Sequence, residues 1–167
     1  TSRELPQFAV LNPIDTHTHI YVGNPAFYAM LKKLNLHILD IMLDDDTDPE
    51  MKDLSKETKD AWGVVHGSDG YVALCTTFDP YTFSQPDFDR VSINKINSDF
   101  ARGAVAVKFY KNVGTQIKDA KGHYLMPDNP IFEPIFKDIE AHNKTLITHL
   151  ADPDSMWEAP NPAAPDY

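Results

Sequence analysis

The chain has 167 residues, of which 42% are hydrophobic, so it can bury a core of ordinary size as one domain. Its 25 acidic residues exceed its 15 lysines and arginines, and the formal net charge of -10 argues against nucleic acid or an anionic membrane as a partner. No apolar stretch approaches the roughly 20 residues of a membrane span, and the first residues lack the pattern of a signal peptide.

Short apolar runs alternate with longer amphipathic stretches along the chain. Five runs have the composition of strands, at residues 12–20, 36–43, 71–78, 103–110 and 144–150. Helical patterns separate them at residues 25–34, 49–65, 86–102 and 130–142. This alternation is typical of parallel strands joined by right-handed crossovers, so the sequence predicts an α/β sheet or barrel.

The helical stretches carry their own start signals. Asn24 precedes Pro25 as an N-cap residue, and Asp48 precedes Pro49 in the same way. Asp48 belongs to the acidic run at residues 44–50, which lacks the glycine turn and distal glutamate of an EF-hand, so we expect a solvated run. The candidate inward-facing residues of the helix at 86–102 are Phe88, Val91, Ile93, Ile96 and Phe100.

The stretch "PIDTHTHIYV", residues 13–22, ends the first predicted strand with two histidines. Because successive side chains of a strand point to opposite faces, His17 and His19 lie on one face with Asp15 behind them. Two neutral imidazoles that converge on one point suit a divalent metal such as zinc. The alternative is a pair of polar residues on a half-exposed edge strand.

Later strands supply further candidate groups. All strands of a parallel sheet end at the same edge, where ligands bind. Lys108 lies near the end of the fourth predicted strand with Tyr110 on the same face, and His149 ends the fifth. A lone lysine would more often be a surface charge and a lone histidine a hydrogen-bonded rim residue. Together with His17 and His19, these residues favour a metal site.

The single cysteine, Cys75, lies in the apolar run "YVALCTTF". We expect a buried, unreactive thiol there, and an internal disulfide is impossible. The compartment stays open. We expect a soluble protein, cytoplasmic or exported after removal of a leader.

The segments "IDTHTHI", "GAVAVKFYKNVG" and "MPDNPIFEPIFKDIEAHNKTLITHLADPDSMW" resemble the amidohydrolase superfamily, specifically the metal-dependent hydrolases related to aromatic-acid decarboxylases. The resemblance runs from residue 13 to residue 157. It implies a (β/α)₈ TIM barrel, which typically needs ~250 residues. We therefore expect residues 1–167 to form the N-terminal part of one barrel domain, with about five of the eight β/α units.

The resemblance also implies roles for individual residues. His17, His19 and His149 would bind a divalent metal, zinc first among the candidates. In binuclear relatives a carboxylated lysine of the fourth strand bridges two ions, and Lys108 stands at that position. In mononuclear relatives a residue there lies outside the ligand set, so one ion and two ions both stay open. The family's sixth-strand histidine and its eighth-strand aspartate, which moves the proton, have no counterpart in this sequence.

Three functions follow as alternatives. The first is hydrolysis, in which a metal-activated water attacks an amide, ester or lactone, and the second is non-oxidative decarboxylation of an aromatic or unsaturated acid. The third is an inactive half-barrel that is stable only with a partner or as a homo-oligomer. Lys108 is the candidate catalytic residue. Tyr110 and His123 are candidate contacts to a small-molecule substrate, because His123 lies in a long loop after the fourth strand.

Overall fold

The computed structural model describes residues 5–49 and 51–150, so the end of the motif quoted above, residues 151–157, lies outside the described residues. The strands are β1 (Ile14–Thr18), β2 (His37–Ile41), β3 (Val72–Thr76), β4 (Ala106–Phe109) and β5 (Thr145–Thr148). The helices are α1 (Leu5–Val10), α2 (Pro25–Leu34), α3 (Leu54–Gly67), α4 (Phe88–Arg102), α5 (Asn112–Thr115) and α6 (Glu133–Ala141), with 3-10 turns η1 (Pro80–Thr82) and η2 (Pro130–Phe132). All five predicted strands are confirmed, each with shorter bounds, whereas α1 and α5 were not predicted.

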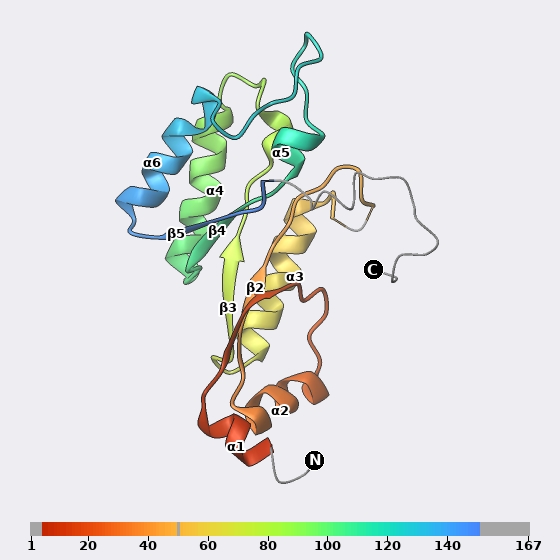
Figure 1. Ribbon diagram of the computed structural model, residues 1–167, viewed down its shortest axis with the longest axis vertical. Coiled ribbons are helices and arrows are strands. Elements are labelled where there is room, and N and C mark those ends of the chain that lie inside the picture. Colours follow the sequence, from red (N-terminus) through yellow and green to blue (C-terminus); the bar gives the residue numbers. More distant parts are fainter. Residues whose placement is uncertain (1–4, 50, 151–167) are drawn as a thin grey trace, which may run out of the picture.

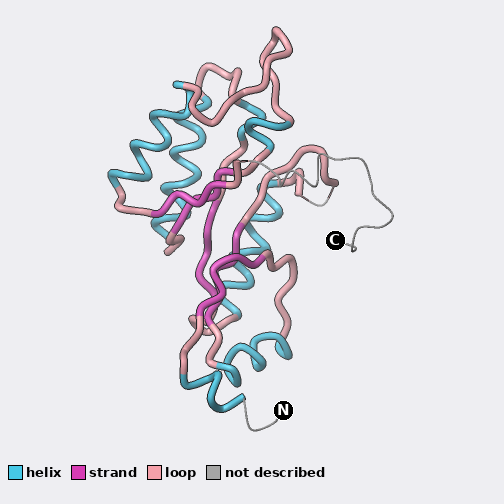
Figure 2. The backbone as a smooth tube through the Cα atoms, viewed as in Figure 1, coloured by secondary structure: helices cyan, strands magenta, loops and turns pink. Residues whose placement is uncertain are grey.

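The strands form one parallel sheet in the order β1-β2-β3-β4-β5. Each strand therefore lies beside the strand that precedes it in the chain. The sheet curls into a half-barrel (Figures 1 and 2), and α3, α4 and α6 pack against it. The predicted α/β class with parallel strands is confirmed, and the carboxyl ends of all five strands lie at the same edge.

The two faces of the sheet have different coverings. Ile38 and Met42 of the β2 region pack with Val64 and Trp62 of α3, so this side is the helix-covered face. Residues of the opposite parity form a separate apolar cluster without helical members, which we call the helix-free face. Its members are Leu39, Ile41, Leu43, Met51, Cys75, Ala106, Tyr110 and Ile147.

The capping residues explain where two helices begin. α2 begins and ends as predicted, and the Asn24 side chain accepts a 3.0 Å hydrogen bond from the backbone nitrogen of Phe27. α3 begins later than predicted, because its cap is Asp53 and not Asp48. Asp53 accepts a 2.9 Å hydrogen bond from the backbone nitrogen of Lys56, while Asp48 takes part in the turn before it.

The expectation of a solvated acidic run after β2 is wrong for its first two residues. Asp44 and Asp45 are only 3% and 6% exposed. The hydroxyl of Tyr81, in η1, donates to Asp45 Oδ1 at 3.2 Å, and Asn112 Nδ2, in α5, donates to the carbonyl oxygen of Asp44 at 2.7 Å. The loops after β2, β3 and β4 are thereby joined at the carboxyl ends of the strands.

α4 buries a carboxylate that hydrophobic periodicity did not predict. Ile96 is buried as predicted, but Val91 is 49% exposed, so the inward prediction for Val91 is wrong. Asp99 is buried instead. It accepts hydrogen bonds from Trp62 Nε1 at 2.9 Å and from Lys95 Nζ at 2.8 Å, so its charge is compensated inside the helix layer.

The burial of the single cysteine and the lack of a membrane span, both expected from the sequence, concern separate features of the chain. Cys75 is 0% exposed, which confirms the expected burial, and burial raises the pKa of its thiol to about 12. Across the described residues, no helix combines the length and apolar character needed to cross a membrane.

Candidate functional site

His17 and His19 lie at the carboxyl end of β1, which ends at Thr18. Their ring centroids are 5.4 Å apart and their planes are inclined at 79°. His17 is exposed and His19 is half-buried. Asp15 accepts a 3.0 Å hydrogen bond from the backbone nitrogen of His17, so it holds the backbone that carries the pair.

A carbonyl group of the neighbouring strand orients the ring of His19. His19 Nδ1 lies 2.7 Å from the backbone oxygen of Ile41, the last residue of β2. A carbonyl oxygen only accepts hydrogen bonds, so Nδ1 is the donor, and in a neutral ring Nε2 would carry the lone pair. Histidines that bind metals are typically held in this way through their second nitrogen.

Lys108 is the third residue of β4 and is 1% exposed. Strand alternation places it on the helix-free face with Ala106. Burial lowers the pKa of its ammonium group, and no carboxylate among the described residues forms an ion pair with it. A lysine in this environment has an increased neutral fraction, which suits it to act as a nucleophile or to form a carbamate.

Electrostatic coupling links Lys108 to the histidine pair. The pKa of His17 is lowered, first by partial burial and then by the positive charges of Lys108 and His19, while Asp15 acts in the opposite direction. This shift favours the neutral imidazole, which is the form that binds a metal ion.

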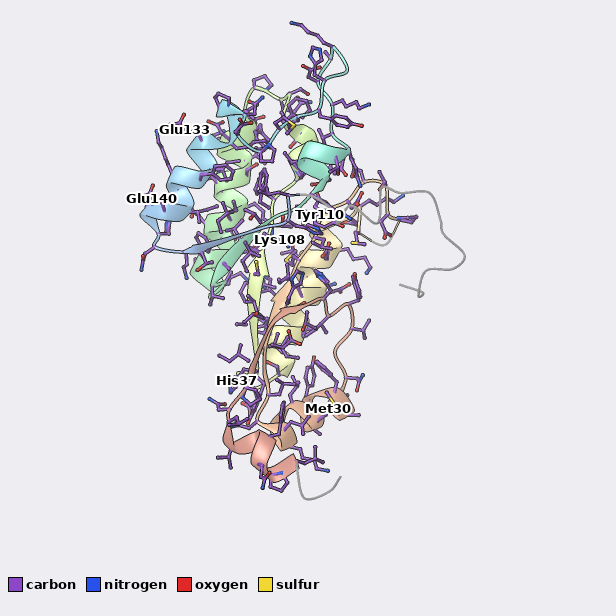
Figure 3. All side chains as sticks on the ribbon, viewed as in Figure 1. Met30, His37, Lys108, Tyr110, Glu133 and Glu140 are labelled. Carbon is purple, nitrogen blue, oxygen red and sulfur yellow. The ribbon has the colours of Figure 1, made fainter. Side chains whose placement is uncertain are left out.

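Tyr110 and His149 form a second contact on the same side of the sheet. Tyr110 follows β4 and His149 follows β5, and their ring centroids are 5.6 Å apart at an interplanar angle of 73°. The backbone nitrogen of His149 donates to the oxygen of Phe109 at 3.0 Å, which continues the pairing of β4 with β5. Tyr110 and Lys108 lie near each other in the middle of the molecule (Figure 3).

The six predicted residues form one group of three, one pair and one separate residue. Within residues 5–49 and 51–150, no group of three or more His, Cys, Asp or Glu side chains is arranged to hold a metal ion. The group of three is His17, which contacts His19, and Lys108, whose charge lowers the pKa of His17; the pair is His149 with Tyr110.

His123 is the separate residue. It lies in the loop after α5, which projects away from the sheet (Figure 1). Its side chain is 75% exposed, and its Nδ1 lies 3.4 Å from Asp119 Oδ2. A bridge between Lys118 and Tyr124 closes this loop at its base. A role of His123 in substrate binding stays a prediction.

A set of buried acids was missed by the sequence reasoning. Burial raises the pKa of Asp40 to about 6, that of Asp44 to about 8 and that of Glu57 to about 7. One carboxyl oxygen of each is buried without a hydrogen-bond partner among the described residues. The signal that points to Asp40 is its position inside the apolar run "LHILDIML".

Comparison with known proteins gives no family for the chain. No family model matches it, and no curated protein and no solved structure matches at a significant level. The function is therefore argued from the geometry and chemistry of the residues described above.

Proposed function

We propose that the chain is the N-terminal part of a metal-dependent hydrolase with a (β/α)₈ barrel, as its resemblance to the amidohydrolase superfamily implies. One observation carries the proposal. His17 and His19 lie in contact at the carboxyl end of β1, and the buried amine of Lys108, from β4, is close enough for its charge to lower the pKa of His17. In parallel barrels this edge of the sheet is where catalytic residues gather.

The histidine pair of β1 offers two nitrogen donors to a divalent cation. Ile41 holds Nδ1 of His19, which leaves Nε2 to face a ligand, and the lowered pKa of His17 favours its neutral imidazole. His149 is the third ligand in this proposal. A zinc ion bound by these histidines would lower the pKa of a water molecule toward about 7 and polarise a carbonyl group.

Lys108 has a chemical role of its own in this proposal. Its lowered pKa increases the fraction of neutral amine, whose lone pair forms a bond to the carbon of CO₂ while a proton leaves the nitrogen. The resulting carbamate carries two oxygens that suit a second cation. The uncarboxylated lysine is the alternative, in which the site holds a single ion.

Decarboxylation of an aromatic acid is the second candidate. The observation that favours it is the edge-to-face contact between Tyr110 and His149, which places an aromatic surface at the end of β4. Aromatic rings prefer offset or edge-to-face neighbours, so this surface suits a planar substrate.

Metal content tests the proposal. His17→Ala and His19→Ala each remove one imidazole, so we expect zinc retained after dialysis to fall well below one equivalent. His142→Ala is the matched control, because His142 caps the end of α6 and bonds to Asp138. Zinc content that is unchanged in both of the first two variants would contradict the proposal.

A further inference from the structure

A pocket of about 450 Å³ lies on the helix-covered side of β2. It is bounded by the loop after β1, by β2 and by the first turns of α3. Its wall combines the apolar side chains of Val22, Met42 and Ala61 with the carboxylates of Asp40 and Glu57. Its volume falls in the range of about 300 to 1,000 Å³ that is usual for small-molecule sites and far exceeds that of a bare ion.

Asp40 and Glu57 are held in the same manner. Asp40 is 2% exposed, and its Oδ1 accepts a 2.9 Å hydrogen bond from the backbone nitrogen of Ile20. Glu57 Oε1 accepts a 3.0 Å hydrogen bond from the backbone nitrogen of Leu43. The second oxygen of each carboxylate is buried and has no hydrogen-bond partner among the described residues. Each group is thus fixed in place with one oxygen unpaired, which is costly unless a donor is supplied.

The charge around the pocket is unbalanced. Its lining contains four carboxylates, those of Asp40, Asp53, Glu57 and Asp60, against the single ammonium of Lys56. Lys56 Nζ forms an ion pair with Asp60 Oδ2 at 2.8 Å, and the Lys56 side chain is 70% exposed. Among the described residues, no lysine, arginine or histidine forms an ion pair with Asp40 or Glu57. The charges of Lys95 and Lys56 act on Glu57 without forming an ion pair with it, so neither Asp40 nor Glu57 has a cation in direct contact among the described residues.

We propose that this pocket binds a small alkylammonium ion, with its ammonium group at the unpaired oxygens of Asp40 and Glu57 and its aliphatic chain on Met42 and Val22. A primary ammonium has three N–H donors and no acceptor, so it matches two acceptor oxygens. Hydrogen bonds between charged groups are stronger than neutral ones, and the apolar wall adds the burial of methylene groups.

The first test compares an amine with its neutral counterpart. The amide spectrum of the full chain is followed by NMR during titration with n-butylammonium chloride or with 1-butanol, with EDTA present. We expect saturable shifts at the amides of Ile20 and Leu43, and at least tenfold tighter binding of the ammonium. Equal affinities, or no saturable shift at millimolar concentrations, would overturn the proposal.

Two charge-removing variants identify the site. Asp40→Asn and Glu57→Gln keep the oxygen that accepts from the backbone, so we expect both variants to fold. An amide spectrum that is unchanged away from the substituted residue checks this. Each should weaken butylammonium binding at least tenfold and leave butanol unaffected. Asp69→Asn removes a carboxylate that is 86% exposed and should have no effect. Wild-type affinity in both pocket variants would overturn the assignment.

Two further experiments distinguish ammonium binding in this pocket from metal binding at the proposed centre. His19 also lines the pocket, but His17 does not, so His17→Ala should abolish zinc binding and leave butylammonium binding intact. A titration with MgCl₂ in the absence of EDTA tests whether the pocket binds a metal ion instead. Shifts of the Ile20 and Leu43 amides at lower concentrations of Mg²⁺ than of butylammonium would overturn the organic cation in favour of a metal ion.

Discussion

Trp62 Nε1 donates a 2.9 Å hydrogen bond to Asp99 Oδ1, and this bond joins α3 to α4. The other oxygen of the same carboxylate accepts from Lys95 Nζ at 2.8 Å. The side chains of Lys95 and Asp99 are 23% and 3% exposed, so both charged groups are largely desolvated. Each charge therefore depends on the other.

Asp99→Ala should lower the free energy of unfolding by about 3 to 5 kcal/mol, because it leaves the charge of Lys95 buried and uncompensated. Urea denaturation measures the change. The matched control is Asp87→Ala, which removes an exposed pair with Arg90 whose side chains are 51% and 65% exposed. That variant should cost no more than about 1 kcal/mol. Similar losses in the two variants would contradict the buried character of the Asp99 pair.

The stability of the fold should decrease as the pH rises from about 4 to about 8. Burial raises the pKa of Asp40 to about 6, of Glu57 to about 7 and of Asp44 to about 8. A carboxyl whose pKa is higher in the folded state binds its proton more tightly there. Its contribution is fully present below the unfolded pKa and is lost as the pH rises through the folded pKa.

Urea denaturation at a series of pH values checks this dependence, and Asp44→Asn isolates one contributor. The variant carries no titratable group at this position, so its stability should fall less steeply than that of the wild type. Asp69→Asn makes the same chemical change at an 86% exposed carboxylate and should retain the wild-type slope. Equal slopes in all three proteins would show that Asp44 ionises normally.

The metal stoichiometry should depend on Lys108. If Lys108 is carboxylated, Lys108→Met removes both bridging oxygens, and the zinc content should drop relative to the wild type prepared with bicarbonate. Carbon-13 bicarbonate should give a carbamate signal in the wild type that the variant lacks. An unchanged metal content together with no such signal would identify a site with a single ion, in which Lys108 acts as an amine.

The contact of Tyr81 with Asp45 should stabilise the loops at the carboxyl ends of the strands. The Tyr81 hydroxyl lies 3.2 Å from both Asp45 Oδ1 and Gln116 Oε1, between which its single proton is shared, so Tyr81→Phe removes links to two loops at once. We expect a loss of about 0.5 to 1.5 kcal/mol and faster amide hydrogen exchange at residues 44–48. Tyr124→Phe, at a residue that is 49% exposed, should change neither quantity.

The sequence predicts best what depends on neighbouring residues. The bounds of α2 follow from Asn24 and Pro25, whose effect on the backbone is local. The meeting of His17 with His19 follows from strand alternation alone. The position of Lys108 on the helix-free face follows in the same way, because its strand is short and regular.

The sequence predicts poorly what depends on distant segments. Asp44 and Asp45 are buried because Tyr81 and Asn112, far along the chain, fold over them. On α4, Val91 is exposed and Asp99 is buried. The buried face of this helix includes a hydrogen-bonded carboxylate, which the spacing of apolar residues does not predict. A buried acid becomes predictable only when its partners are known.

The order of the strands has a consequence for how the chain acquires its structure. Each strand pairs with the one made just before it, so no strand has to wait for a distant segment. During synthesis, which proceeds at about 5 to 20 residues per second, each new β/α unit meets an edge that is already formed. Sheets closed by late segments must search for partners over long loops, which slows folding. This half-barrel can instead assemble progressively from β1 toward β5 as the polypeptide leaves the ribosome.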